Sequence, residues 1–147
     1  MRIVHKVTLK TKASTKAIWK VWQNVEDWPG WDKELEWVTI DGPFIEGQTG
    51  KIKPKGSPVS SFKITTCVPF KQCTSVSKLP LTQLIFDHYV KFENGETLIT
   101  HQILMKGPLS WLFNKLIGPK LKKGLDEAVR HLIQKAENSE GKKEYAL

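Results

Sequence analysis

Apolar and polar residues alternate over most of the chain between residues 36 and 106, which is the pattern of β-strands that bury one face. The same alternation opens the chain. Turn sequences such as Asn94-Gly95 separate the alternating runs. The pattern therefore predicts seven strands, over residues 2–10, 36–41, 48–54, 60–68, 72–78, 82–93 and 96–106.

Two other segments repeat their apolar residues with the period of an α-helix. Ser14 is a typical N-cap residue, and the stripe that follows it predicts a first helix. Trp28-Pro29-Gly30-Trp31 is expected to end that helix, because proline and glycine disfavour its continuation. The stripe consists of Ile18, Val21, Trp22 and Val25.

The second helical segment begins near Pro108 and carries a long apolar stripe. Gly118-Pro119 interrupts it, and a proline inside a helix removes one backbone hydrogen bond and clashes with the carbonyl four residues earlier. We expect a kink there, or a short helix followed by a longer one from about residue 119 to residue 138. The stripe consists of Leu112, Leu116, Leu121, Leu125, Ala128, Val129, Leu132 and Ala136.

Asn94-Gly95 between two alternating runs is the strongest hairpin signal in the chain. With a two-residue turn, Glu93 pairs with Glu96, and counting outward places His88 directly opposite His101. A slip of one residue would send both histidines to the other face. The face that carries them is otherwise apolar, so it is predicted to point inward; it comprises Leu84, Phe86, His88, Val90, Phe92, Thr97, Ile99, His101, Ile103 and Met105.

The histidine pair has several interpretations. The two imidazoles are either neutral residues of a half-buried wall or a polar anchor that orients a ligand in an apolar pocket. His5 on another inward face could complete a metal site, although no metal is predicted, because no carboxylate has a clear inward position. Because imidazole titrates near neutrality, His88 or His101 is also a candidate general acid–base.

The chain has 147 residues, of which 26% are charged and 39% apolar, as in folded globular domains. We predict one domain over residues 1–138 and a polar, disordered tail over residues 139–147. No apolar run approaches the roughly 18 residues that span a bilayer. The first ten residues also lack the apolar core of a signal peptide. These features favour a cytoplasmic protein.

The net charge is +8, and the lysines are spread along the whole chain. A solvated basic surface explains this spread better than nucleic-acid binding, because no nucleic-acid-binding motif accompanies the charge. Cys67 and Cys73 are separated by five residues, a spacing that matches no common zinc or redox motif. We therefore expect free thiols that could face each other across a hairpin, and no cofactor.

The order of strand, helix, aromatic loop, six strands and long C-terminal helix resembles the START/Bet v1-like (SRPBCC, helix-grip) superfamily, and most closely its polyketide cyclase/dehydrase-like branch. The resemblance is carried by residues 17–22 and 25–32, by Gly47-Gln48-Thr49-Gly50, and by residues 99–103, 107–109, 116–118 and 124–128. Together these segments span most of the chain.

The resemblance implies an α+β fold: a seven-stranded curved antiparallel sheet wrapped around a long C-terminal helix, with one or two short helices after the first strand. It places strand 2–10 beside strand 96–106, which would bring His5 near the histidine pair. It also implies a cavity between sheet and helix for an apolar ligand. The superfamily contains binders, carriers and cyclases, so the fold does not fix the chemistry.

Two apolar segments have alternative roles. Trp28 and Trp31 either cap the core or gate the cavity. The apolar stretch 108–117, followed by Lys120, Lys122 and Lys123, is either the buried start of the last helix or a surface for transient membrane contact.

The leading functional hypothesis is binding or transport of a hydrophobic or amphipathic small molecule, lipid-like or polyketide-like. The alternatives are a cyclase/dehydratase-type enzyme that uses His88 or His101, and a protein-interaction module with a filled cavity. The sequence leaves the ligand, the oligomeric state and catalysis open. The predicted ligand-binding residues are Phe86, His88, Val90, Ile99, His101, Ile103, Leu125, Trp28 and Trp31.

Overall fold

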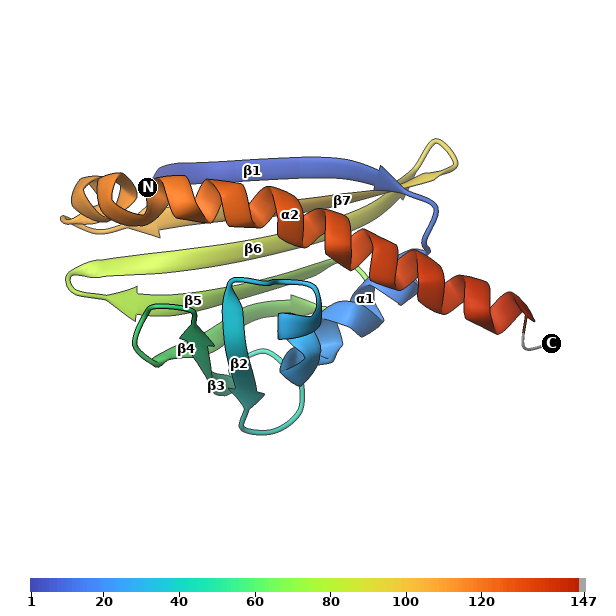
Figure 1. The fold of residues 1–147 in the computed structure, drawn as a ribbon, viewed down its shortest axis with the longest axis horizontal. Helices are drawn as coiled ribbons and strands as arrows, with labels where there is room; N and C mark the ends of the chain where they lie inside the picture. Colours follow the sequence, from blue (N-terminus) through green and yellow to red (C-terminus); the bar gives the residue numbers. More distant parts are fainter. Residues whose placement is uncertain (146–147) are drawn as a thin grey trace.

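Seven strands form one antiparallel sheet in the order β1-β7-β6-β5-β4-β3-β2, and a long helix, α2, crosses it (Figure 1). The computed structural model describes the backbone of residues 1–145 and the side chains of residues 1–140. All predicted strands are present, each within one residue of its predicted ends. The strands are β1 (Arg2–Thr11), β2 (Leu35–Ile40), β3 (Thr49–Pro54), β4 (Ser60–Val68), β5 (Gln72–Leu79), β6 (Thr82–Glu93) and β7 (Glu96–Lys106).

Two short helices follow β1, namely α1 (Thr15–Gln23) and the 3-10 helix η1 (Val25–Gly30). The predicted N-cap is confirmed, since the amide of Ala17 donates to Ser14 Oγ over 3.1 Å. The apolar stripe predicted for the first helix is wrong at Val25. The helix α1 ends at Gln23, and Val25 is the first residue of η1. Pro29 lies inside η1 and not at the end of α1.

The helix α2 (Ser110–Tyr145) continues through Pro119. Of the two outcomes expected at this proline, a kink or a division into two helices, the division is therefore wrong. Ile117 and Leu121 pack against the core on either side of the proline. This packing offsets the lost hydrogen bond, because helices in proteins depend more on buried faces than on propensity. The helical backbone also extends to residue 145, into the predicted polar tail, whose last two residues lie outside the described part of the chain.

One core joins the inward face of the sheet, α1, η1 and α2. Its fully buried side chains come from all of these layers, for example Trp22 of α1, Ile99 of β7 and Leu132 of α2. The helix-grip arrangement is therefore held by apolar contacts of the one long helix with the sheet. Within residues 1–145, no helix combines the length and the apolar character needed to cross a membrane.

The β6–β7 hairpin has the predicted register. Glu93 pairs with Glu96, and His88 pairs with His101. Asn94 and Gly95 both have positive φ, of 52° and 77°, which is the conformation that a two-residue type I′ turn requires. The strand β1 lies beside β7, as expected. The turn sequence thus sets which side chains of β6 and β7 face the core.

Candidate functional site

The His88 and His101 rings lie side by side on the inward face, with centroids 4.2 Å apart and planes at 81°. The predicted pair is therefore confirmed in position. Two strands that pair in register supply both rings, and Trp22 of α1 packs against each of them, with centroid distances of 5.6 and 5.7 Å. Trp31 contacts His101 edge-on at 6.1 Å. Two imidazoles and two indoles thus form one aromatic cluster.

Hydrogen bonds fix the tautomer of each imidazole. The Trp22 indole nitrogen donates to Nε2 of His101 over 3.1 Å, so the neutral His101 ring carries its proton on Nδ1. His88 donates from Nδ1 to the carbonyl of Cys73 over 3.0 Å. Its Nε2 is then left as a hydrogen-bond acceptor. The two rings are uncharged residues of the wall, each held in one orientation.

Burial keeps both imidazoles neutral. Desolvation lowers the pKa of His88 to about 4, although the hydrogen bond to Cys73 acts in the opposite direction. Desolvation, together with the neighbouring His88, lowers the pKa of His101 well below its usual value. At neutral pH the pair therefore supplies directional polar atoms without a buried charge.

Trp31 places an unsatisfied donor in this cluster. Its side chain is only 4% exposed, and its indole nitrogen has no hydrogen-bond partner among the described residues. The neighbouring Trp28, by contrast, donates to the carbonyl of Trp22 over 2.9 Å. A buried N–H without a partner costs about 1–3 kcal/mol, so an acceptor supplied by water or by a ligand would stabilise it.

The loop that carries Trp31 is anchored to α2. His131 donates from Nδ1 to the Trp31 carbonyl over 3.3 Å, and Lys135 forms an ion pair with Asp27. Burial raises the pKa of Asp32 to about 6, even though the amide of Glu34 donates to its carboxylate. These contacts hold the Trp28–Trp31 segment over the core.

The predicted ligand-binding residues all gather around this one core, but their contact with a ligand remains a prediction. Two of them, Phe86 and His88, face inward and are intermediate in burial. Phe92 was predicted on the same inward face, yet it is 69% exposed because it lies at the hairpin tip, beyond the core. The others are less than one-tenth exposed: Trp28, Trp31, Val90, Ile99, His101, Ile103 and Leu125.

His5 does not join the histidine pair. A register shift between Ile3 and His5 places His5 opposite Ile103, and its Nε2 lies 2.9 Å from Asp126 Oδ1 of α2. Among residues 1–140, no three His, Cys, Asp or Glu side chains are close enough to hold a metal ion. The contact of His5 with Asp126 instead ties β1 to the long helix.

Sequence reasoning missed the small residues of β5 on the inner wall. Ser75 pairs with Phe86 and Ser77 pairs with Leu84, and both serines are buried. Because directly paired residues point to the same face, their hydroxyls line the same interior as the histidines. The alternation of Cys73, Ser75 and Ser77 along one strand was the available signal.

A second polar cluster, also missed, occupies the outward face. The Asp87 carboxylate is only 8% exposed and accepts hydrogen bonds from four side chains. Burial alone would raise its pKa, but these donors lower it overall. The hairpin register could have indicated this cluster, because it places Gln102 opposite Asp87. The donors are Thr74, Tyr89, Gln102 and Gln72.

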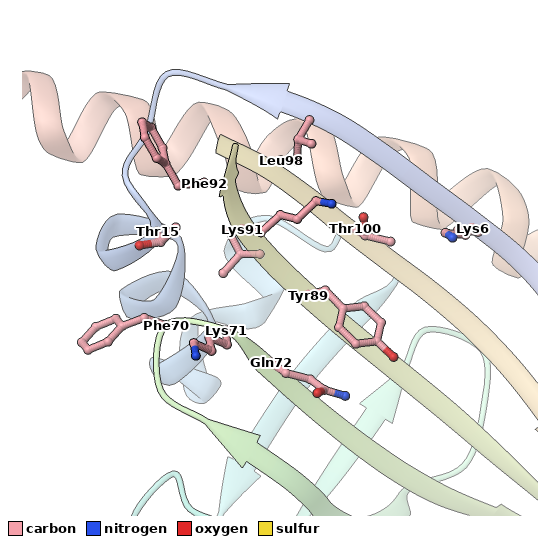
Figure 2. Close-up of a pocket in the computed structure, with 11 residues that line it drawn as sticks. Lys6, Thr15, Phe70, Lys71, Gln72, Tyr89, Lys91, Phe92, Leu98 and Thr100 are labelled. Atoms are coloured by element: carbon pink, nitrogen blue, oxygen red, sulfur yellow. The ribbon is translucent and has the colours of Figure 1, made fainter. Parts of the chain in front are cut away.

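Beside this cluster lies an open groove of about 630 Å³ (Figure 2). Figure 2 shows side chains of β1, β5, β6 and β7 around it, with Thr15 at the start of α1. Three lysines, Lys6, Lys71 and Lys91, border it together with Phe70 and Tyr89. The groove lies mainly over the outward face of the sheet and is separate from the histidine pair.

Cys67 and Cys73 lie opposite each other on β4 and β5, as considered from the sequence, and both are free thiols. Burial raises the pKa of each thiol, so neither carries the thiolate character of a reactive cysteine. Cys73 acts here through its backbone, whose carbonyl holds His88.

The sequence matches no family model and no curated protein, whereas many solved structures match the fold. One of them is the di-domain ARO/CYC StfQ from the steffimycin biosynthetic pathway, at 14% identity and a TM-score of 0.76. The match covers 95% of this chain and 53% of that one, so the present chain spans about half of the di-domain protein.

Two shorter proteins match over almost their whole length. TTHA0849 from Thermus thermophilus has 9% identity and a TM-score of 0.68, with 91% of this chain and 97% of that chain covered. Ara h 8.0201 has 11% identity and a TM-score of 0.63, with 88% and 97% covered. At these identities the likeness concerns the fold alone. The chain has the helix-grip fold of START/Bet v1-like (SRPBCC) proteins.

Proposed function

We propose that this protein binds a mostly apolar small molecule that carries a hydrogen-bond acceptor, such as a carbonyl oxygen, between the sheet and α2. The observation that carries the proposal is the buried, unpartnered indole N–H of Trp31 beside His101. A ligand acceptor would satisfy this donor. Proteins of this fold typically bind hydrophobic ligands, and the neighbour from the steffimycin pathway is an ARO/CYC protein.

The neutral histidine pair supports the same proposal. His88 offers Nε2 as an acceptor on the inward face of β6. Ligand pockets of this kind are mainly apolar, with a few fixed polar groups that set orientation. Affinity would come from apolar burial, at about 25 cal/mol per Å² before ordering costs. The donor of Trp31 and the acceptor of His88 would select which end of the ligand enters.

Acid–base catalysis by the pair has weaker support. A general base works best with a pKa near the working pH, and the pKa of His88 is lowered to about 4. His101 already accepts a hydrogen bond from Trp22 through Nε2. We therefore propose a binding protein or carrier ahead of a cyclase or dehydratase.

The decisive experiment compares two probes of similar shape, anthraquinone and anthracene, by titration with intrinsic tryptophan fluorescence. Anthraquinone carries carbonyl acceptors and anthracene carries none. We expect anthraquinone to bind about tenfold more tightly, the equivalent of roughly one hydrogen bond. Native mass spectrometry of the freshly purified protein, followed by denaturing extraction, would identify any ligand that is already bound.

Matched variants assign the preference to a residue. Trp31→Phe keeps an aromatic ring but removes the N–H, so it should bind both probes equally. Trp37→Phe changes a tryptophan that is 40% exposed on β2 and should leave the preference intact. A protein that purifies without ligand and takes up neither probe would contradict the proposal and favour an interaction module with a filled interior.

A further inference from the structure

Large apolar side chains are exposed at one end of the molecule, where α2 begins. Trp111 and Leu116 of α2 are 57% and 65% exposed, Leu81 of the β5–β6 turn is 70% exposed, and Ile3 of β1 is 62% exposed. Figure 1 shows the start of α2, the chain's N-terminus and the β5–β6 turn at the same end. We call these four residues the apolar tip.

Two close approaches show that the segments carrying the apolar tip lie against one another. A Cβ added at Gly107, which precedes α2, would lie 2.4 Å from the Leu81 carbonyl oxygen, so the β5–β6 turn sits directly against the start of α2. A Cβ at Gly118 would lie 3.9 Å from a methyl group of Val4, next to Ile3. The turn, the helix and the first strand therefore meet at this end.

Core packing does not account for the exposed residues. Phe113, Ile117 and Leu121 supply the contacts of this part of α2 with the core, whereas Trp111 and Leu116 are outside the core cluster. The start of the helix is thus apolar both toward and away from the sheet. Helices with apolar residues on every side normally have a second apolar partner.

The segments that form the apolar tip are rich in lysine. Residues 97–125 contain five lysines and no aspartate or glutamate, and residues 1–25 also contain no acid. Lys120 forms an ion pair with Glu34. The other four, Lys106, Lys115, Lys122 and Lys123, are exposed and form no ion pair with the described side chains.

We propose that the apolar tip docks on an anionic lipid bilayer, with the surrounding lysines against the headgroups. Exposed apolar side chains combined with lysines are what binding at an anionic interface requires. A second copy of the chain would fit less well, because it would bring two basic surfaces together. The interaction goes beyond ligand binding in the core and uses none of the residues proposed for it.

The test is co-sedimentation with vesicles of about seven parts phosphatidylcholine to three parts phosphatidylglycerol, compared with pure phosphatidylcholine vesicles. We expect the full chain to bind the anionic vesicles and to lose binding as salt is raised. Lys115→Glu combined with Lys122→Glu should reduce binding at least about tenfold. Trp111→Ser combined with Leu116→Ser should reduce it by a similar factor, with circular dichroism showing an intact fold.

Each control makes the same kind of substitution at another position on the surface. Lys12→Glu with Lys63→Glu makes the same change of charge at exposed sites away from the start of α2, and Trp37→Ser with Ile45→Ser removes exposed apolar residues elsewhere. Both should retain binding. Equal losses in the controls, equal binding to neutral vesicles, or a self-associating protein that binds no vesicles would each overturn the proposal.

Discussion

The Trp22 indole nitrogen donates to Nε2 of His101 over 3.1 Å, and this bond between α1 and β7 decides where the His101 proton resides. Together with the bond from His88 to Cys73, it requires the Nδ1-protonated tautomer in both rings. Long-range ¹H–¹⁵N NMR spectra at neutral pH should therefore show this tautomer for both histidines. An Nε2-protonated form of His101 would contradict the geometry.

Trp22→Phe should destabilise the fold through the same bond. The substitution leaves Nε2 of His101 as a buried acceptor without a partner, at a cost of about 1–3 kcal/mol in addition to the lost packing. Urea unfolding at neutral pH measures this cost. Trp37→Phe, at the partly exposed tryptophan of β2, should change stability by less than about 0.5 kcal/mol. Similar effects in the two variants would mean that the Trp22 bond contributes nothing specific.

The lowered pKa of His88 predicts a loss of stability in acid. The unfolded chain binds a proton at this residue near pH 6.5, whereas the folded chain resists it until about pH 4. The unfolded state therefore binds more protons between these values, and stability falls as the pH falls through this window. Relative to His88→Leu, the native protein should lose about 2–3 kcal/mol between about pH 7 and pH 4.5.

Urea unfolding of both proteins across this pH range gives the difference directly. Because Asp32 is present in both, its own titration cancels in the comparison. Parallel pH profiles for the two proteins would show that the native imidazole titrates normally and is not desolvated.

Asp87→Ala should lower the stability of the fold more than most substitutions on the outward face of the sheet. It removes the acceptor shared by four side chains, and hydrogen bonds to a charged group contribute about 1.5–3 kcal/mol. We expect a loss of about 2–3 kcal/mol in urea unfolding at neutral pH. Asp41→Ala, which removes an exposed carboxylate bonded to the Thr49 hydroxyl, is the control and should cost less than about 1 kcal/mol.

Two glycines with positive φ should respond differently to alanine. Gly95 has φ of 77° and open space where a Cβ would lie, so Gly95→Ala should cost about 1 kcal/mol from the backbone alone. Gly107 has φ of 131°, and its Cβ would meet the Leu81 carbonyl, so Gly107→Ala should cost about 3 kcal/mol or more. Thermal unfolding of both variants measures which one loses more stability. Equal losses would show that a Cβ at Gly107 does not clash with the Leu81 carbonyl.

Local signals predicted much of the candidate site. Asn94-Gly95 fixed the register of β6 and β7, and that register placed His88 opposite His101 and Gln102 opposite Asp87. The prediction succeeded because a two-residue turn with positive φ leaves only one way to count the pairs. The strand boundaries followed from the same alternation and its turn residues.

Contacts between residues far apart in the chain could not be predicted from these local signals. No pattern indicated that Trp22 would donate to His101, that Trp31 would keep an unsatisfied N–H, or that His5 would turn to Asp126 across 121 positions of the chain. The division into two helices, one of the two outcomes expected at Pro119, is absent for the same reason, since core contacts on both sides of the proline outweigh a local preference.

The sequence by itself determined the strands, the hairpin register and the identity of the inward-facing histidines, because alternation and turn geometry act between near neighbours. Only the tertiary structure decided the protonation of those histidines, the continuity of α2 and the exposure of the apolar tip. Burial and hydrogen-bond partners depend on which distant segments pack together, and that packing sets both the local dielectric and the free polar atoms.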